Sequence, residues 1–179
     1  MSGASSALAR TLEELRREFD RGFALAPQGA REVGERFIAL RVGGEPCAIR
    51  LAEIAGLHAA GRVLPLPSGL ASLLGAAGLR GRIVAVHDLA VLLGHGAGGK
   101  PRWLALARGA DSIALGFEAF ESQIVAAPGD VIAADGAAAR QHARAAVRSG
   151  QALRPIVDLP SVIEEIRRLA RTPQVPKEA

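Results

Sequence analysis

Apolar and polar residues alternate in short stretches along this chain, a pattern typical of half-buried β-strands. The stretch from Ile38 to Val42 alternates, the pair Gly43-Gly44 follows, and apolar residues resume over residues 47–49. Two such stretches around a glycine pair predict a β-hairpin, because glycine readily adopts the positive φ angles that a two-residue turn needs.

Further short apolar stretches follow at close spacing. A short helix is expected over residues 70–74 and another over residues 89–93, where the Asp88 side chain can cap the first turn. Many short strands with few long helices favour β-barrels over a parallel sheet covered by helices. We expect a short apolar segment over residues 54–57, strands over 83–86, 103–107, 113–117, 122–126, 143–147 and 153–157, and loops over 64–67, 78–81, 94–99 and 127–139.

Both ends of the chain show helical spacing instead. Residues 8–25 place an apolar residue every three or four positions, and Pro27 and Gly29 end the pattern. This amphipathic helix either packs on its own domain or mediates self-association or partner binding, and the sequence leaves both open. A second helix is expected over residues 161–171, with Ser161 and Glu164 as its capping box. The apolar positions are Leu8, Leu12, Leu15 and Phe19 in the first helix and Val162, Ile166 and Leu169 in the second.

The charge of the chain raises the question of nucleic acid. The 179 residues carry a net charge of +4, and the pI is about 10.5. A small β-barrel that binds nucleic acid is therefore the alternative function. Aromatic residues make up only 3% of the chain, with one tryptophan and no tyrosine, so the stacking platforms of single-strand binding proteins are missing. We predict no nucleic-acid partner.

Cysteine content and hydropathy bear on the compartment. Cys47 is the only cysteine, which excludes an intramolecular disulfide framework and a multi-cysteine zinc site and favours a small buried apolar residue. The N-terminal residues lack the uncharged apolar core of a signal peptide, and no stretch reaches the roughly 18 apolar residues of a membrane span. We expect a cytoplasmic protein without direct membrane insertion.

The residue patterns favour no catalytic, metal or cofactor site. Residues 94–100 match the letters of a phosphate-binding loop, but Pro101 follows where the motif needs a hydroxyl side chain and the start of a helix. No two of the four histidines have the spacing of a helical metal site. His87 and Asp88 are adjacent on a predicted strand, so their side chains point to opposite faces. We predict a protein that is not an enzyme and has no cofactor.

Arg80 is the side chain best placed to contact another protein. It lies between Leu79 and Gly81 in a predicted turn, where glycines let the backbone bend and leave the guanidinium accessible. Arginine is enriched at the energetic centres of protein interfaces, because its planar group makes several directed hydrogen bonds. An ordinary solvated turn arginine is the other interpretation, and from the turn alone both stay open.

The order of these elements resembles the CheW family. The match covers roughly residues 35–165, and its most specific part is the spacing of the family's G-x-x-x-L-R-G-x-x-x-P-V-x-D-L run. The stretches that carry the resemblance are residues 37–45 with 48–49, residues 54–57 followed by 64–67, residues 74–75, 79–81 and 83–89, residues 115–117, and residues 154–159.

The resemblance implies a mainly β fold of two intertwined SH3-like five-stranded barrels, with an N-terminal amphipathic helix and a C-terminal helix. Residues 35–171 would form the CheW-like domain, with one subdomain over about 35–98, completed by a late return strand, and another over 99–160. Residues 1–34 would be a helical extension and residues 172–179 a flexible tail.

The resemblance also implies a scaffold that couples the cytoplasmic tip of a methyl-accepting chemoreceptor to the regulatory domain of a CheA-type histidine kinase, in chemotaxis or in a pathway such as pilus motility. Arg80, with Leu79 and Gly81, would lie near the receptor-facing surface. Ile54 and Leu57 would be neighbouring apolar contact positions.

Three positions depart from the family pattern. Ala85 stands where a proline is usual, and Gly78 replaces a common asparagine. Gly56 stands where many members carry a glutamate, and this exchange removes a charged contact that a receptor could use.

Overall fold

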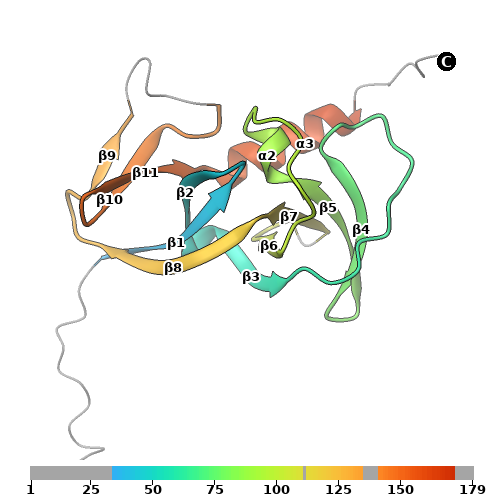
Figure 1. The fold of residues 1–179 in the computed structure, drawn as a ribbon, viewed down its shortest axis with the longest axis horizontal. Coiled ribbons are helices and arrows are strands. Elements are labelled where there is room, and N and C mark those ends of the chain that lie inside the picture. Colours follow the sequence, from blue (N-terminus) through green and yellow to red (C-terminus); the bar gives the residue numbers. More distant parts are fainter. Residues whose placement is uncertain (1–33, 111, 135–140, 172–179) are drawn as a thin grey trace, which may run out of the picture. The chain divides into compact units, whose positions relative to one another are not determined.

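The computed structural model describes residues 34–110, 112–134 and 141–171 (Figure 1). The helix predicted over residues 8–25 and the tail predicted over residues 172–179 lie outside this range. The described residues are mainly β, as the sequence predicts, and their strands form two sheets.

The first sheet has six strands in the order β8-β1-β2-β11-β10-β9. The predicted hairpin at Gly43-Gly44 is confirmed: Leu40 pairs with Cys47, and both glycines have positive φ angles. The strands are β1 (Glu35–Val42), β2 (Glu45–Arg50), β8 (Ala119–Ala126), β9 (Val131–Ala133), β10 (Ala145–Ser149) and β11 (Ala152–Val157).

The second sheet has five strands in the order β3-β6-β7-β5-β4. Neighbours pair antiparallel except β5 and β7, which run parallel. The strands are β3 (Ile54–Ala59), β4 (Leu73–Leu79), β5 (Arg82–Asp88), β6 (Trp103–Ala107) and β7 (Ile113–Phe117).

The six-stranded sheet combines strands from both ends of the described chain. The N-terminal hairpin of β1 and β2 joins the C-terminal strands, because β8 pairs with β1 and β11 pairs in parallel with β2. The second sheet is built from one continuous part of the chain, residues 54–117. Pairings between strands this distant in sequence depend on tertiary packing, which local patterns do not encode.

Alternation along the strands builds the core. In β1, Phe37 and Ala39 pack in an apolar cluster within the first sheet, whereas Ile38 and Leu40 pack in a central cluster shared with the second sheet and the helices. A third cluster, which includes Val84 and other residues of the second sheet, packs within that sheet. Strands such as β1 are therefore buried on both faces, which explains their nearly continuous apolar sequence.

In the described part of the chain, the helical segments are the short 3-10 helix η1 (Leu51–Glu53), α2 (Leu89–Leu92) and α3 (Leu159–Arg171). The predicted cap of α2 is confirmed, because the Asp88 carboxylate accepts a hydrogen bond from the Ala90 backbone N at 2.9 Å. The predicted apolar face of α3 is also confirmed at Val162 and Ile166, which are buried in the central cluster.

The start of α3 differs from the prediction. The helix begins at Leu159 rather than Ser161, and Asp158 accepts a hydrogen bond from the Ser161 backbone N at 3.3 Å. The Ser161 hydroxyl instead bonds the His142 ring at 2.7 Å. A tertiary contact therefore occupies the side chain that the capping-box pattern marks as the cap.

Two further predictions about local structure were wrong. Residues 70–74, expected as a helix, form a turn that leads into β4, because pairing with β5 outweighs the helical spacing of the leucines. The expected loop over residues 127–139 contains the short strand β9, which pairs with β10. Residues 135–140 of that loop lie outside the described range.

Candidate functional site

Strand register brings Ile54 and the turn with Leu79, Arg80 and Gly81 to one end of the five-stranded sheet, whereas Leu57 pairs with Ala105 in the middle of the strands. In the antiparallel pairs, the start of β3 lies beside the end of β6, and the end of β6 lies beside the start of β7. β5 runs parallel to β7, so both strands start at the same end of the sheet, and the end of β4 lies beside the start of β5. The β4–β5 turn with Arg80, the β6–β7 turn with Arg108 and the first residues of β3 therefore lie at the same sheet end. We call this region the sheet end.

The hairpin of β4 and β5 extends beyond its neighbour. β5 begins at Arg82, but its pairing with β7 begins only at Ala85. Arg80 and Gly81, with φ angles of 50° and 76°, form the turn, which matches the type I′ geometry of tight hairpins. The Arg80 side chain is exposed and has no hydrogen bond or ion pair within the described residues. Leu79 is half-buried against the apolar cluster of the second sheet.

Ile83 is a contact candidate that the sequence pattern missed. The side chain is 81% exposed although it belongs to an apolar strand sequence. Its cross-strand partner is Gly78, which has no side chain to cover it. The glycine at position 78, noted above as a departure from the family pattern, was the available signal.

The two predicted apolar positions of β3 differ in accessibility. Ile54 is only 5% exposed and lies in the central cluster, so its side chain supports the fold and offers a partner little surface. Leu57 is half-buried and packs at the edge of the same cluster. Of these two residues, Leu57 is the one that a partner can reach.

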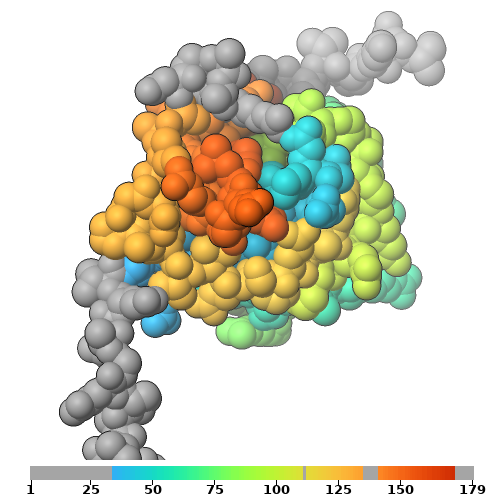
Figure 2. Space-filling model, turned by 60° about the vertical axis from the view of Figure 1, so that its left-hand side comes forward, coloured from blue at the N-terminus to red at the C-terminus, as the bar shows by residue number. Residues whose placement is uncertain are grey.

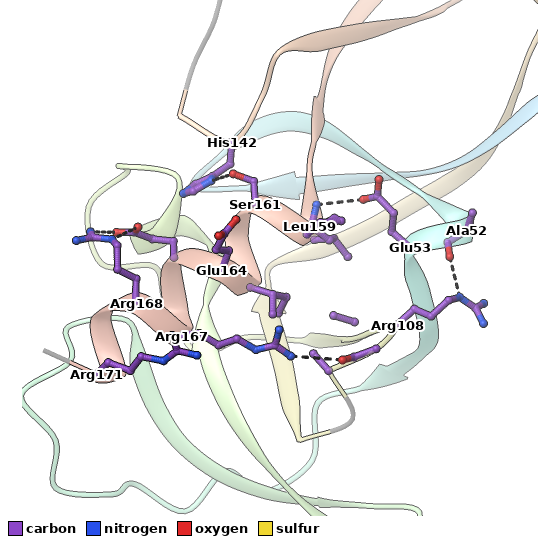
Figure 3. Close-up of a pocket in the computed structure, with 16 residues that line it drawn as sticks. Ala52, Glu53, Arg108, His142, Leu159, Ser161, Glu164, Arg167, Arg168 and Arg171 are labelled. Atoms are coloured by element: carbon purple, nitrogen blue, oxygen red, sulfur yellow. Dashed lines mark hydrogen bonds and ion pairs between the residues drawn. The ribbon is translucent and has the colours of Figure 1, made fainter.

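A groove of about 1090 Å³ lies beside α3 (Figure 3). η1, the β6–β7 turn and the exposed side of α3 form its walls, and apolar side chains such as Ala110, Leu159 and Ile163 contribute to its lining. Its basic residues are Arg108, Arg167, Arg168 and Arg171, and its acidic residues are Glu53, Glu164 and Glu165.

Most of these arginines are tied to the protein itself. Arg108 donates to the carbonyl oxygens of Ala52 and Ile54, at 2.7 and 3.0 Å, and this fixes the β6–β7 turn against the start of β3. Arg167 donates across the groove to the Gly109 carbonyl at 3.4 Å. Arg168 pairs with Glu165 at 2.6 Å. The groove therefore has a rigid wall on the β6–β7 side and a basic rim.

Two ionisable groups hold the N-terminus of α3 at this groove. The Glu53 carboxylate accepts a hydrogen bond from the Leu159 backbone N at 3.0 Å, and burial raises the pKa of Glu53 despite this bond and nearby Arg50. Burial lowers the pKa of His142, whose ring bonds Ser161, although Glu165 and Asp158 oppose the shift. Both groups position α3 rather than line a reaction centre.

The other polar candidates have structural partners. The buried His87 ring bonds the Ser72 hydroxyl at 3.2 Å, and burial lowers its pKa. In addition to capping α2, the Asp88 carboxylate accepts a hydrogen bond from the Gly98 backbone N at 3.0 Å. Asp88 therefore anchors the glycine loop over residues 94–99, whose sequence matches the letters of a phosphate-binding motif. Cys47 is buried, as predicted. Within the described ranges, no group of three or more His, Cys, Asp or Glu side chains could hold a metal ion.

The outer face of the six-stranded sheet provides a second exposed apolar surface. Leu153 is 55% and Ile132 is 38% exposed, and they share this face because their partners on β10, Arg148 and Ala146, are two residues apart. Figure 2 shows the side of the molecule that carries β8 to β11, coloured yellow to orange. We call this region the outer face.

Charged residues also bridge the strands of this sheet. Glu121 binds Arg41 at 2.9 Å and Arg154 at 2.7 Å, and these two guanidinium groups lower the pKa of the carboxyl. These ion pairs link β8 to β1 and to β11 and so stabilise the six-stranded sheet.

The described residues thus form two β-sheets around a shared core and carry an exposed hairpin, a groove and a separate exposed apolar face. The CheW-like domain model matches residues 36–167, and the chain therefore belongs to the CheW-like family of chemotaxis adaptors. This finding confirms the resemblance seen in the sequence.

The fold is shared with a solved structure. The scaffolding protein TtCheW from Thermoanaerobacter tengcongensis aligns with a TM-score of 0.62 and 14% sequence identity, over 70% of this chain and 89% of that chain. A comparison with curated proteins gave no match. These findings give no support to the nucleic-acid alternative. No helix among the described residues is long and apolar enough to cross a membrane.

Proposed function

We propose that this chain is a non-catalytic cytoplasmic adaptor that couples the tip of a methyl-accepting chemoreceptor to the regulatory domain of a CheA-type histidine kinase. Membership of the CheW-like family supports a scaffold role. The proposal requires two separate binding surfaces on one rigid body, and the sheet end and the outer face are suited to this.

The receptor tip is assigned to the sheet end and its groove. A groove with apolar residues and a charged rim is suited to the side of a helix, the mode in which amphipathic helices bind proteins. Arg80 at the neighbouring hairpin offers several hydrogen-bond donors to the same partner. Leu79 and Gly81 act by shaping the turn, and Leu57 adds apolar contact from the middle of β3.

The kinase regulatory domain is assigned to the outer face. Leu153 and Ile132 are exposed apolar side chains on adjacent strands, and Arg148 lies opposite Leu153. Apolar residues next to an arginine are typical of the energetic centre of an interface.

Both contacts would be of the size usual for signalling complexes, on the order of 1,200–2,000 Å² of total buried surface. Coupling then needs no chemistry within the adaptor. A change in the receptor alters the relative stability of two assemblies, and the adaptor transmits this difference because it binds both partners at fixed positions.

The observation that carries the proposal is the overhanging hairpin, which presents to solvent an exposed isoleucine and an arginine without a partner among the described residues. The proposal is tested by two separate co-purification experiments, one with a receptor-tip fragment and one with a kinase regulatory domain. Arg80→Ala should weaken capture of the receptor fragment while circular dichroism and melting temperature stay unchanged.

Arg102→Ala is the matched control, since Arg102 is also exposed but precedes β6 at the opposite end of the same sheet. It should leave capture unchanged. Equal capture of the receptor fragment by all three proteins would remove Arg80 from the surface, and no capture of either partner by the unsubstituted chain would reject the adaptor role.

A further inference from the structure

One wall of the groove beside α3 is a stripe of that helix. Exposed residues that line the groove recur there every three or four positions and therefore lie along one helix face: Pro160, Glu164, Arg167 and Arg171. In Figure 3 the side chains of Arg167 and Arg171 extend from adjacent turns of α3 in the same direction. The wall thus presents charged side chains at helical spacing.

The sign of the charge changes along this stripe. Glu164 lies in the N-terminal half of α3, and Arg171 is the last residue of the helix. The seven positions between them correspond to about two helical turns, or roughly 10 Å along the helix axis. The stripe is therefore acidic toward the start of α3 and basic at its end.

The two charges at the ends of the stripe are available to a partner. Neither the Glu164 nor the Arg171 side chain has an ion pair or hydrogen bond among the described residues. Their neighbours Glu165 and Arg168, in contrast, neutralise each other through two hydrogen bonds of 2.6 and 2.7 Å. Charged groups that face a partner across an interface contribute mainly to specificity and register.

The remaining lining of the groove is suited to an apolar surface. Leu159, Ile163 and Ala110 line the groove and belong to the central cluster. On the opposite side, Arg108 fixes the β6–β7 turn by hydrogen bonds to two backbone carbonyl oxygens, at 2.7 and 3.0 Å. A bound segment therefore needs apolar side chains on one side and charged side chains toward α3, which is the arrangement of an amphipathic helix.

We propose that Glu164 and Arg171 set the register of a helix bound in this groove, with an acidic side chain of the partner at Arg171 and a basic side chain about seven residues away at Glu164. The inference rests on the proposed function, in which the partner is the receptor tip. It adds to that function the charge pattern that the receptor helix must carry.

Binding of a receptor-tip fragment to full-length variants tests the inference. Arg171→Glu should weaken binding about tenfold in low salt, because it replaces an attraction by a repulsion. The loss should shrink in high salt, which screens exposed charges. Arg102→Glu is the matched control, since it makes the same charge change at an exposed residue before β6, at the opposite end of the five-stranded sheet. An equal loss in this control would show that only net charge matters and would overturn the inference.

A double variant separates the order of the charges from the net charge. Glu164→Arg combined with Arg171→Glu keeps the net charge of the chain and reverses the charge order along the groove. It should bind the fragment more weakly than the unsubstituted protein, with an unchanged circular dichroism spectrum. Equally tight binding of the double variant overturns the inference.

Charge reversals in the fragment measure the register. Arg171→Glu should regain affinity for a fragment in which one acidic residue is replaced by lysine. Glu164→Arg should regain affinity for a fragment in which one basic residue is replaced by glutamate, about seven residues from the first position. A spacing of about three residues would indicate an extended segment, which rises about 3.3 Å per residue, and would overturn the inference. The absence of rescue at every position would also overturn it.

The outcomes distinguish this inference from the proposed function. If Arg80→Ala weakens capture of the fragment and the charge reversals on α3 do not, the receptor contact stands and the inference alone is overturned. If the unsubstituted chain does not bind the fragment, the inference and the proposed receptor contact are overturned together.

Discussion

The Glu53 carboxylate accepts a hydrogen bond from the backbone N of Leu159, 3.0 Å away in space and 106 residues away in sequence. Glu53 lies in η1 between the two sheets in chain order, and Leu159 is the first residue of α3. The bond satisfies a helix-terminal N–H that has no partner inside the helix. It fixes α3 against the sheets and so sets the position of one groove wall.

Removal of this acceptor should destabilise the protein. Glu53→Ala leaves the Leu159 N–H without its partner and should lower the free energy of unfolding by about 1 kcal/mol. Glu53→Gln keeps an oxygen that can accept the bond and should lose less. Chemical denaturation of both variants measures the difference, and equal losses would show that the hydrogen bond contributes nothing.

The pH dependence of the Glu53 variants has a defined sign. Burial raises the native pKa of Glu53 above its ordinary value, so the native state binds this proton more tightly than the unfolded chain does. The stabilising effect of that proton is fully present below the unfolded pKa and is lost as the pH rises through the native pKa. Glu53→Gln should therefore gain stability relative to the unsubstituted protein between about pH 4 and pH 7. A difference that is constant or falls over this interval contradicts the assignment.

Alanine substitutions at Ile54 and Leu57 should have different effects, the first mainly on stability and the second mainly on binding. Ile54 is buried in the central cluster, so Ile54→Ala should lower the free energy of unfolding by about 2–4 kcal/mol. Leu57→Ala should cost less, because its side chain is half-buried, and should weaken receptor binding. Thermal melts and binding assays on both variants check this, and a larger stability loss for Leu57→Ala would reverse the assignment.

Gly75 should tolerate no side chain. Its φ angle is 141°, and a Cβ atom there would collide with the backbone of Leu64 and lie 2.8 Å from Pro65 Cα. Leu64 forms a bridge with neighbouring Ala76, so this loop cannot easily move away. Gly75→Ala should lower the melting temperature strongly, whereas Gly99→Ala, in open space, should have little effect. Similar melting temperatures for the two variants would contradict the close approach.

Ile83 should affect binding without affecting stability. Because the side chain is 81% exposed, Ile83→Asn should change the free energy of unfolding by less than about 0.5 kcal/mol. It should reduce binding of the receptor-tip fragment, since an exposed apolar side chain beside the Arg80 turn is part of the same hairpin. Isothermal titration calorimetry with the fragment measures this, and unchanged affinity would exclude Ile83 from the surface.

Local patterns in the sequence determined the elements that depend on neighbouring residues. The Gly43-Gly44 hairpin, the Asp88 cap, the strands over residues 103–107 and 113–117 and the apolar face of α3 all follow from alternation, turn glycines or helical spacing. The ordered run from Gly75 to Leu89 was specific enough to indicate the CheW-like family, which the family comparison confirms.

Tertiary structure alone decided which of these elements come together. The pairing of β11 with β2, the burial of Ile54 in the central cluster and the bond between Glu53 and Leu159 each bring together residues that are distant in sequence. Hydrophobic periodicity indicates which side of a strand is buried. It does not indicate which distant strand covers that side, because the hydrophobic effect is non-directional and does not select a particular partner. Register and packing make that choice, and they place the arginine turn and the groove at one end of a sheet.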